Sequence, residues 1–335
     1  MKALSESLAL TIIMEWDNVL LAEMSRCEAM LDRLGQQIER LLNHQARETA
    51  SGLRVADQIQ VILAFDIDEV PEDELVRDAR RALAGVESHI IWTLAPARGA
   101  TYYELKNFAV QRATGDIVVL LDSDAIPEAD WLERLIGPFT DPSIDVVGGG
   151  SYIELGGIYA KSFALGWLFP LRKKGDLHEA TSFYANNVAF RAEIIRSHPF
   201  PSLPGACRGA GRLLANELIE ADVRIYRNPE ARISHPPPRP RHFVRRGIAQ
   251  GRDNLIRTRF LTGTESVPFR HSWDDARRRT TRAWRRILNK RNQVQIKVVE
   301  IPVAMLIIGS YYGLYLAGDM LMRAAPRTMV NAFRI

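Results

Sequence analysis

The sequence has few cysteines and no large excess of charge of either sign. Only Cys27 and Cys207 occur among its 335 residues, which excludes a disulfide framework or a cysteine metal finger and suits a reducing compartment. Its 44 Lys and Arg against 40 Asp and Glu give a net charge of +4, and no internal repeat is evident. With 47% hydrophobic and 25% charged residues, the composition predicts a globular chain that buries a large core.

Several sequence signals are also missing. The apolar run Leu8–Met14 is followed by no small-residue cleavage pattern, so we expect no secretory signal peptide. No glycine-rich loop bearing Lys or Arg follows this run, which argues against a nucleotidyltransferase that binds a nucleoside triphosphate. The arginine-rich residues 239–291 accompany no recognition module for nucleic acid, and we therefore expect no nucleic-acid partner.

Strand and helix patterns alternate along the first part of the chain. A parallel, doubly wound α/β sheet is predicted by this alternation. The expected strands are Leu8–Met14, Ile59–Phe65, His89–Leu94 and Ile117–Leu121, and the expected helices are Asn18–Leu42, Glu72–Leu83 and Tyr102–Gln111.

The most informative stretch is the apolar run Ile117–Leu121, which ends in Asp122 and Asp124 with one residue between them. Acidic residues also follow the first two expected strands, at Glu15 and Asp66. The carboxyl ends of parallel strands meet at one edge of a sheet, where α/β proteins bind ligands. Carboxylates there suit Mg²⁺ or Mn²⁺ and leave coordination positions for phosphate oxygens. The pattern predicts a divalent cation and a nucleoside-diphosphate ligand.

Three ordered motifs resemble family 2 glycosyltransferases with the GT-A fold. The donor-side motif comprises residues 98–107 and 113–132, the acceptor-side motif residues 184–191, and the closing motif residues 226–235. The resemblance covers about residues 8–237. It implies a mostly parallel GT-A (Rossmann-like) sheet flanked by helices, and transfer of a sugar from a nucleoside-diphosphate sugar to a hydroxyl acceptor. The acceptor would be a glycan, a lipid-linked molecule or a cell-envelope polysaccharide.

The resemblance also implies roles for single residues. Asp124 would bind the metal together with His235, Asp122 would contact the ribose or the metal, and Asp122 and Asp124 would be the catalytic residues. The implied donor-binding residues are Glu15, Asp66, Arg98, Asn107 and Asp122. From the residues themselves, we expect Asn186, Asn187 and Arg208 to bind the acceptor.

One departure from the family pattern concerns the general base. The acidic pair that supplies this base in inverting members falls on Ala210 and Gly211, and neither can accept a proton. Three explanations stay open. In the first, Glu217 or Asp222 serves as the base, although Glu217 lies about 9 Å of helix rise beyond Gly211. In the second, the enzyme retains the configuration of the sugar. In the third, the chain is a nucleotide-sugar-binding scaffold of a polysaccharide assembly system with impaired catalysis.

The C-terminal third combines arginine-rich and apolar sequence. We expect a nucleotide-sugar-binding half at 1–150, an acceptor-side half at 151–237, a basic helical arm at 238–297, and a membrane-associated or transmembrane helix at 298–322. The apolar run Ile301–Gly318 is of borderline length for a span and would otherwise be a buried helix or a dimer interface. The arginines that precede it would keep the catalytic domain at the cytoplasmic face of the membrane and suit anionic lipid headgroups or a lipid-linked phosphate.

Overall fold

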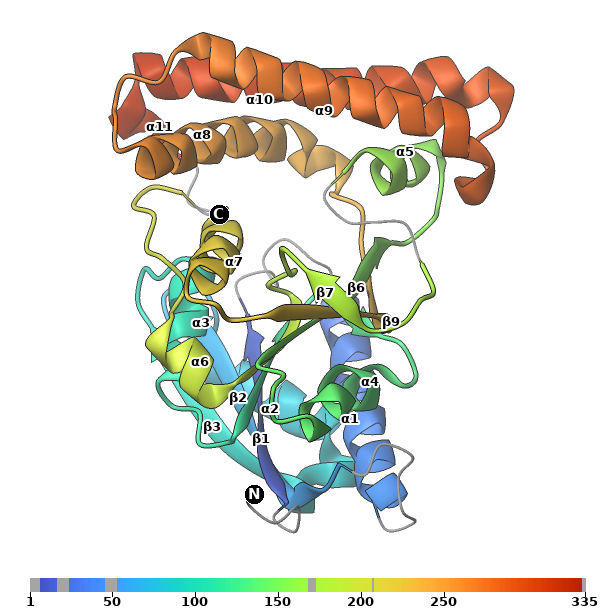
Figure 1. Ribbon diagram of the computed structural model, residues 1–335, viewed down its shortest axis with the longest axis vertical. Helices are drawn as coiled ribbons and strands as arrows, with labels where there is room; N and C mark the ends of the chain where they lie inside the picture. Colours follow the sequence, from blue (N-terminus) through green and yellow to red (C-terminus); the bar gives the residue numbers. More distant parts are fainter. Residues whose placement is uncertain (1–6, 17–23, 46–52, 168–172, 207, 333–335) are drawn as a thin grey trace. The chain divides into compact units, whose positions relative to one another are not determined.

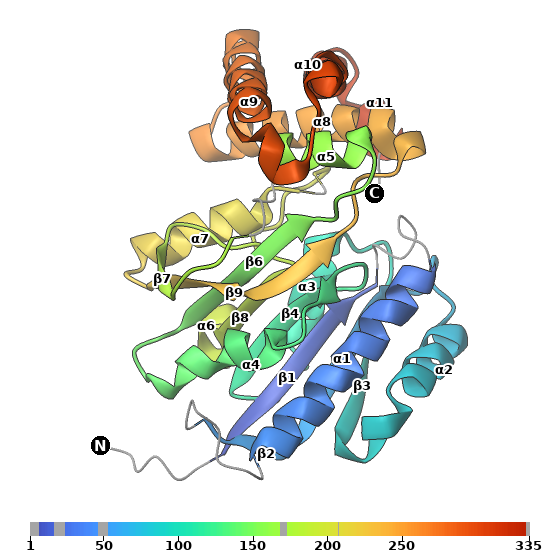
Figure 2. The ribbon, with the colours of Figure 1, turned by 90° about the vertical axis from the view of Figure 1, so that its right-hand side faces the viewer.

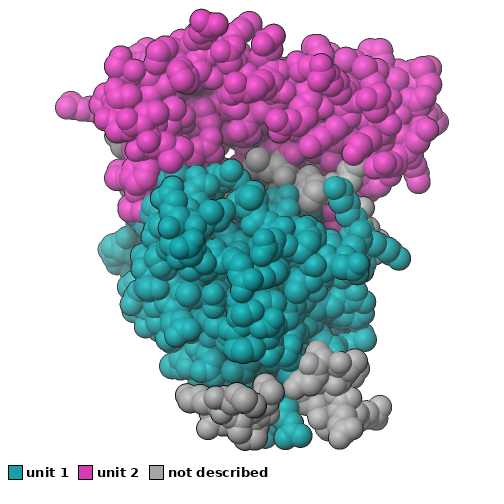
Figure 3. Space-filling view, viewed as in Figure 1, with its two compact units in different colours: residues 1–151, 173–201, 211–234 teal, residues 152–172, 202–210, 235–335 magenta. Residues whose placement is uncertain are grey.

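The computed structural model describes residues 7–16, 24–45, 53–167, 173–206 and 208–332. It divides into two compact units, coloured separately in Figure 3. Unit 1 comprises residues 1–151, 173–201 and 211–234, and unit 2 comprises residues 152–172, 202–210 and 235–335. The bounds of the four expected domains stay a prediction. Cys207 and residues 18–23 of the expected first helix lie outside the described residues.

Unit 1 contains the sheet, and its first half is parallel as expected. The strands run in the order β3-β2-β1-β4, with parallel pairing throughout this half. Their bounds are β1 Leu8–Glu15, β2 Val55–Asp66, β3 Ile90–Ala97 and β4 Ile117–Asp122. All six residues of β4 are buried, as its unbroken apolar sequence predicts for a central parallel strand. The predicted α/β class is confirmed.

The second half of the sheet contains antiparallel pairs. The order continues β8-β6-β9-β5 with β7 beside β9, and β8 pairs antiparallel with both β4 and β6. The bounds are β5 Ile126–Pro127, β6 Val146–Ile153, β7 His178–Ala180, β8 Asn187–Arg191 and β9 Ile225–His235. The four strands that alternate with helices pair in parallel, because a helix supplies the long crossover connection that a parallel neighbour needs.

Helices cover both sides of this sheet. Figure 2 shows α1 and α4 in front of the strands, and α1 packs Met30, Leu34 and Ile38 into the main core beneath it. Thr101 and Glu104 form a capping box that begins α3, which fixes the start of a helix at the candidate site. The bounds are α1 Met24–Gln45, α2 Glu72–Ala82, α3 Tyr102–Val110, α4 Trp131–Ile136, α6 Ala192–Ser197 and α7 Ala210–Glu220.

Unit 2 is a cluster of helices. They are α5 Ile158–Gly166, α8 Phe243–Thr262, α9 Phe269–Lys290, α10 Ile301–Ala324 and α11 Pro326–Ala332. Gly263, with φ of +62°, ends α8 in the left-handed conformation that glycine adopts without strain. A Cβ at Gly251 of α8 or at Gly318 of α10 would collide with the backbone of the other helix. These glycines therefore let α8 and α10 pack in close contact (Figure 1).

Candidate functional site

The structure brings the strand-end acids of unit 1 together. Glu15 lies opposite Asp122 in the parallel pairing of β1 with β4. On its other side Glu15 lies opposite Ala64, two residues before Asp66 at the end of β2. The exposed fraction is 0% for Glu15, 4% for Asp122 and 6% for Asp66 and Asp124. Four carboxylates are thus nearly buried along the carboxyl edge of three adjacent strands.

Asp122 is held by two side chains of α3. The ammonium of Lys106 donates to Asp122 Oδ1 at 2.7 Å and to the carbonyl oxygen of Ala185 at 2.9 Å. The Tyr102 hydroxyl lies 2.9 Å and 3.1 Å from the two carboxylate oxygens of Asp122. Lys106 is completely buried. Sequence reasoning missed both residues, although their i, i+4 spacing puts them on one face of a helix that precedes the Asp-x-Asp strand.

Two neighbouring groups indicate a negative potential at this edge. Burial raises the pKa of the Tyr102 hydroxyl well above its usual value, and the charges of Asp122 and Glu15 raise it further. Burial likewise raises the pKa of the Cys27 thiol to about 12, with further contributions from Asp124 and Glu15. Cys27 is therefore a core residue and not a reactive thiol at neutral pH. The carboxylates thus raise the pKa of groups on both α1 and α3.

Asp124 lies in the turn between β4 and β5. Its carbonyl oxygen accepts a hydrogen bond of 2.5 Å from Arg26 Nε of α1, and Arg26 also donates to the carbonyl oxygen of Ser234 at 3.1 Å. Arg26 thus ties the turn to the end of β9, and sequence reasoning missed it. Between the two acids, the hydroxyl of Ser123 is buried and has no hydrogen-bond partner among the described residues.

The other expected donor residues lie in loops or serve the backbone. Asp66 Oδ1 accepts from the backbone N–H of Asp68 at 2.9 Å, and exposed Arg98 lies 3.6 Å from the Asp68 carboxylate. The Asn107 side chain bonds both the N–H and the carbonyl of Phe200, at 2.9 and 2.8 Å. Asn107 therefore fixes the segment that follows α6, and its contact with a donor stays a prediction.

The two expected acceptor asparagines differ in their surroundings. Asn187 is completely buried. Its amide accepts from Trp131 Nε1 at 2.8 Å and donates to the carbonyls of Gly150 and Ala231 at 3.0 and 2.9 Å. These bonds join β8 to β6, β9 and α4, which gives Asn187 a structural role. Asn186, 4% exposed, accepts from the Ser151 hydroxyl at 3.3 Å. Contact of either residue with an acceptor stays a prediction.

The position of the missing base lies at the start of α7. A Cβ on Gly211 would lie 3.3 Å from the Tyr103 hydroxyl and 3.6 Å from Ala185 Cβ, so this position borders the loop that Lys106 also contacts. Glu217 lies about 240° around the helix from Gly211. Its carboxylate pairs with His198 Nδ1 at 2.9 Å and is 47% exposed. Asp222, with φ of +60°, follows the end of α7.

Arg208 and His235 belong to unit 2, whereas Asp124 belongs to unit 1. His235 is 5% exposed, and its Nδ1 lies 2.8 Å from the carbonyl oxygen of Pro236. Because a carbonyl only accepts, Nδ1 of the neutral ring carries the hydrogen and Nε2 the lone pair, as in metal-binding histidines. Arg208 lies near enough to Tyr311 for its charge to oppose the rise in the Tyr311 pKa that burial causes. A metal site shared by Asp124 and His235 stays a prediction.

Within the described ranges, no group of three His, Cys, Asp or Glu side chains is arranged to hold a metal ion. Mg²⁺ and similar ions at phosphate sites commonly use one or two carboxylates and complete their shell with substrate oxygens. The buried carboxylates, the negative potential and the unpartnered Ser123 hydroxyl between the two acids fit such a site better than a closed metal cage.

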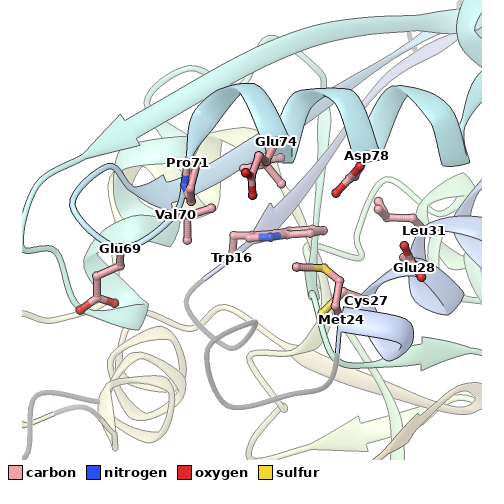
Figure 4. Close-up of a pocket in the computed structure, with 11 residues that line it drawn as sticks. Trp16, Met24, Cys27, Glu28, Leu31, Glu69, Val70, Pro71, Glu74 and Asp78 are labelled. Atoms are coloured by element: carbon pink, nitrogen blue, oxygen red, sulfur yellow. The ribbon is translucent and has the colours of Figure 1, made fainter.

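A pocket of about 150 Å³ opens beside this edge, between α1 and α2 (Figure 4). Trp16, which directly follows Glu15, lies across it, with Met24 and Cys27 on one side. Glu74 and Asp78 of α2 lie on the opposite side. The pocket is thus lined by both apolar and acidic side chains.

The central part of the chain matches a known protein family. Residues 98–198, which include β4, α3 and the buried asparagines, match the sequence profile described as glycosyl transferase family 2. This segment is similar in sequence to glycosyltransferase family 2. The resemblance noted in the sequence is thereby confirmed.

More distant relatives match longer parts of the chain. A glucosyl-dolichyl phosphate glucuronosyltransferase from Haloferax volcanii is 21% identical over 195 residues, which are 53% of this chain and 59% of the relative. A mannosyltransferase from Pyrobaculum calidifontis, solved with GDP-mannose and Mn²⁺, is 16% identical with a TM-score of 0.49, over 99% of this chain and 83% of its own. S. aureus TarS is 11% identical with a TM-score of 0.47, over 95% of this chain and 92% of the solved chain.

Proposed function

We propose that this protein transfers a sugar from a nucleoside-diphosphate sugar to an acceptor. The observation that carries the proposal is the set of nearly buried carboxylates, Glu15, Asp66, Asp122 and Asp124, at the edge of the parallel strands. This edge is where α/β sheets bind nucleotides, and Asp122 and Asp124 lie within the segment that matches family 2. The match of this segment to a glycosyltransferase profile favours a transferase over the scaffold without catalysis.

Asp124, with His235 as a second ligand, would hold Mn²⁺ or Mg²⁺ against the donor diphosphate. Bound there, the cation would supply a positive charge that stabilises the leaving diphosphate. The chain's own residues prepare the site. Lys106 and Tyr102 fix the carboxylate of Asp122 in one orientation, and Arg26 holds the turn that carries Asp124. Glu15, Asp66 and Asp122 would bind the nucleoside, with Arg98 and Asn107 next to it.

The acceptor could be a phosphate group in place of a hydroxyl group. Ala210 and Gly211 leave no carboxylate at the start of α7, and Glu217 pairs with His198 at the surface. A hydroxyl acceptor needs a base, whereas a phosphate monoester, whose second pKa is about 6, is already anionic at pH 7. The missing base therefore favours an anionic acceptor, such as a lipid-linked phosphate, over a neutral hydroxyl. Asn186, Asn187 and Arg208 are the acceptor-side residues that we propose.

Membrane association follows from unit 2. The segment Val298–Ala324 is long and apolar enough to cross a membrane, with a mean hydropathy of 1.5, and an arginine-rich helix precedes it. We propose that the protein acts at the cytoplasmic face of a membrane, where anionic lipids attract positively charged segments.

Donor binding tests the proposal directly. Calorimetric titration of the full chain with UDP- and GDP-sugars, with and without Mn²⁺, should show binding that depends on Mn²⁺. Asp124→Asn should weaken the Mn²⁺-dependent binding by about a hundredfold or more, since charged partners contribute most of the affinity at such sites. Asp73→Asn, at an exposed position of α2, is the matched control and should bind as the wild type does.

Two results would contradict the proposal. One is an unchanged affinity of Asp124→Asn in the presence of Mn²⁺, with the same thermal unfolding as the wild type. The other is the absence of binding by any sugar nucleotide. Transfer of radiolabelled sugar to a phosphorylated lipid, compared with its unphosphorylated alcohol, decides between the anionic and the hydroxyl acceptor.

A further inference from the structure

We propose that α9 and α10 present one apolar face that lies flat in the interface of an anionic bilayer, and that α10 does not cross the membrane. This α9–α10 face comprises Trp273, Trp284, Leu288, Val303, Leu306 and Leu321, which are 37–68% exposed. The inference specifies the membrane partner proposed above. It is independent of the sugar-transfer reaction.

The outward side of α10 is apolar over nearly its whole length. Between Ile301 and Met322 the sequence has a single charged residue, Asp319, and that residue is completely buried. Leu306 is 68% exposed, and Val299, just before the helix, is 81% exposed. Soluble monomers rarely expose a contiguous apolar surface of this length, about 30 Å over twenty helical residues.

Helix α9 extends this face sideways. Trp284 Nε1 donates to the carbonyl oxygen of Met305 at 3.0 Å, which places the indole at the junction of the two helices. Trp273 and Leu288 are eleven residues before and four residues after Trp284, and this spacing puts all three on one side of α9. Figure 1 shows the two helices running side by side. Tryptophan is the residue most typical of the boundary between lipid and water.

Basic residues border the α9–α10 face. Helix α9 has eight Lys and Arg against two Asp. Five of its arginines are exposed. Arg278, Arg282 and Arg285 lie about 100° or more around the helix from Trp284, whereas Arg270 and Arg277 lie on the side of the tryptophans, where their long side chains can reach the headgroups. An apolar strip next to a row of arginines is complementary to acyl chains below anionic headgroups.

The opposite side of α10 argues against a membrane-spanning orientation. Asp319 accepts hydrogen bonds from Ser272 of α9 and from Arg323, and the Tyr315 hydroxyl donates to Asp275 of α9 at 2.9 Å. These bonds fix α9 alongside α10. If α10 crossed the bilayer, α9 would have to cross with it and carry its exposed arginines into the hydrocarbon, at a cost of several kcal/mol.

A second copy of the chain fits the face less well than a bilayer does. In a two-fold dimer the same patch contacts itself, so the arginine row of one copy would border that of the other. Repulsion between these rows would oppose the association, whereas anionic headgroups would be attracted to both.

Vesicle flotation of the full chain, without nucleotide, tests the surface. The wild type should float with vesicles of phosphatidylcholine containing about one third phosphatidylglycerol, and much less with pure phosphatidylcholine. Leu306→Glu should reduce binding at least about tenfold, because it replaces an inserted apolar side chain with a charge. The matched control Ile91→Glu, at a residue of β3 that is 46% exposed, should float as the wild type does.

Trp284→Ala should also reduce flotation, and Arg278→Gln with Arg285→Gln should remove the preference for anionic vesicles. Equal flotation of Leu306→Glu and wild type would overturn the proposal. A wild-type dimer that Leu306→Glu converts to monomers, with no binding to vesicles, would assign the face to a second copy instead. Because no sugar nucleotide is present in the flotation assay, its result does not depend on whether the protein is a glycosyltransferase.

Single cysteines at the two ends of α10 decide its orientation. In a chain without the other cysteines, Val299→Cys and Met320→Cys should be labelled by a membrane-impermeant maleimide from the same side of the membrane. Labelling from opposite sides would show that α10 spans the bilayer and would refute the flat orientation.

Discussion

Replacing Lys106 with methionine tests whether the buried ion pair with Asp122 organises the donor edge. The change keeps a side chain of similar length but removes the charge that lies 2.7 Å from Asp122 Oδ1. The paired groups are 0% and 6% exposed, so the carboxylate would stay buried without its cation. Breaking a buried pair in this way typically costs 3–5 kcal/mol.

The consequence should be visible in thermal unfolding of unit 1. For a domain of about 200 residues, 3–5 kcal/mol corresponds to a Tm lower by about 6–20 °C. Lys174→Met, at an exposed lysine, should leave Tm unchanged. The double variant Lys106→Met with Asp122→Asn should recover part of the loss, because the uncompensated charge is gone. A double variant no more stable than Lys106→Met, or a single variant with wild-type Tm, would refute the reasoning.

Two further predictions concern residues whose surroundings exclude a catalytic role. Glu217→Gln should leave the rate of sugar transfer within about twofold of the wild type, because Glu217 is half exposed and pairs with His198 at 2.9 Å; a steady-state assay that shows a loss of a hundredfold or more would restore it as the base. Cys27, with a pKa raised to about 12, should react with a thiol reagent only after unfolding. Its contribution to stability should be complete below pH 9 and fall as the pH rises toward 12, so Cys27→Ala should lessen the loss of Tm over that range.

The parallel half of the fold is predictable because its signals are local. Each of its strands is an apolar run with a helix pattern after it, and the acids at the strand ends share one edge by the geometry of parallel pairing alone. Glu15 and Asp122 are opposite each other as that geometry requires. The second half of the sheet depends on pairings between distant segments, such as the antiparallel pair of β4 with β8, which no short pattern specifies.

Side-chain partners inside the site were the least predictable part. Lys106 is an ordinary helix residue in the sequence, and only the approach of α3 to β4 makes it the cation that pairs with Asp122. Asn187 is half of a pair typical of turns, yet the bonds that its amide makes to Trp131, Gly150 and Ala231 hold four elements together. In both cases the role depends on distant backbone and side chains that meet only after folding.

Helix α10 illustrates why hydropathy alone cannot assign a membrane orientation. Its 24 residues correspond to about 36 Å, enough to cross a bilayer core of about 30 Å. The contacts of its side chains, however, argue against a membrane-spanning orientation. Tyr315 and Asp319 are completely buried and hydrogen-bonded to α9, so α10 is joined along its length to a helix rich in exposed arginine. A flat orientation lets the outward leucines of α10 enter lipid while the arginines of α9 stay in water. It therefore accounts for both the apolar sequence of α10 and the basic sequence of α9.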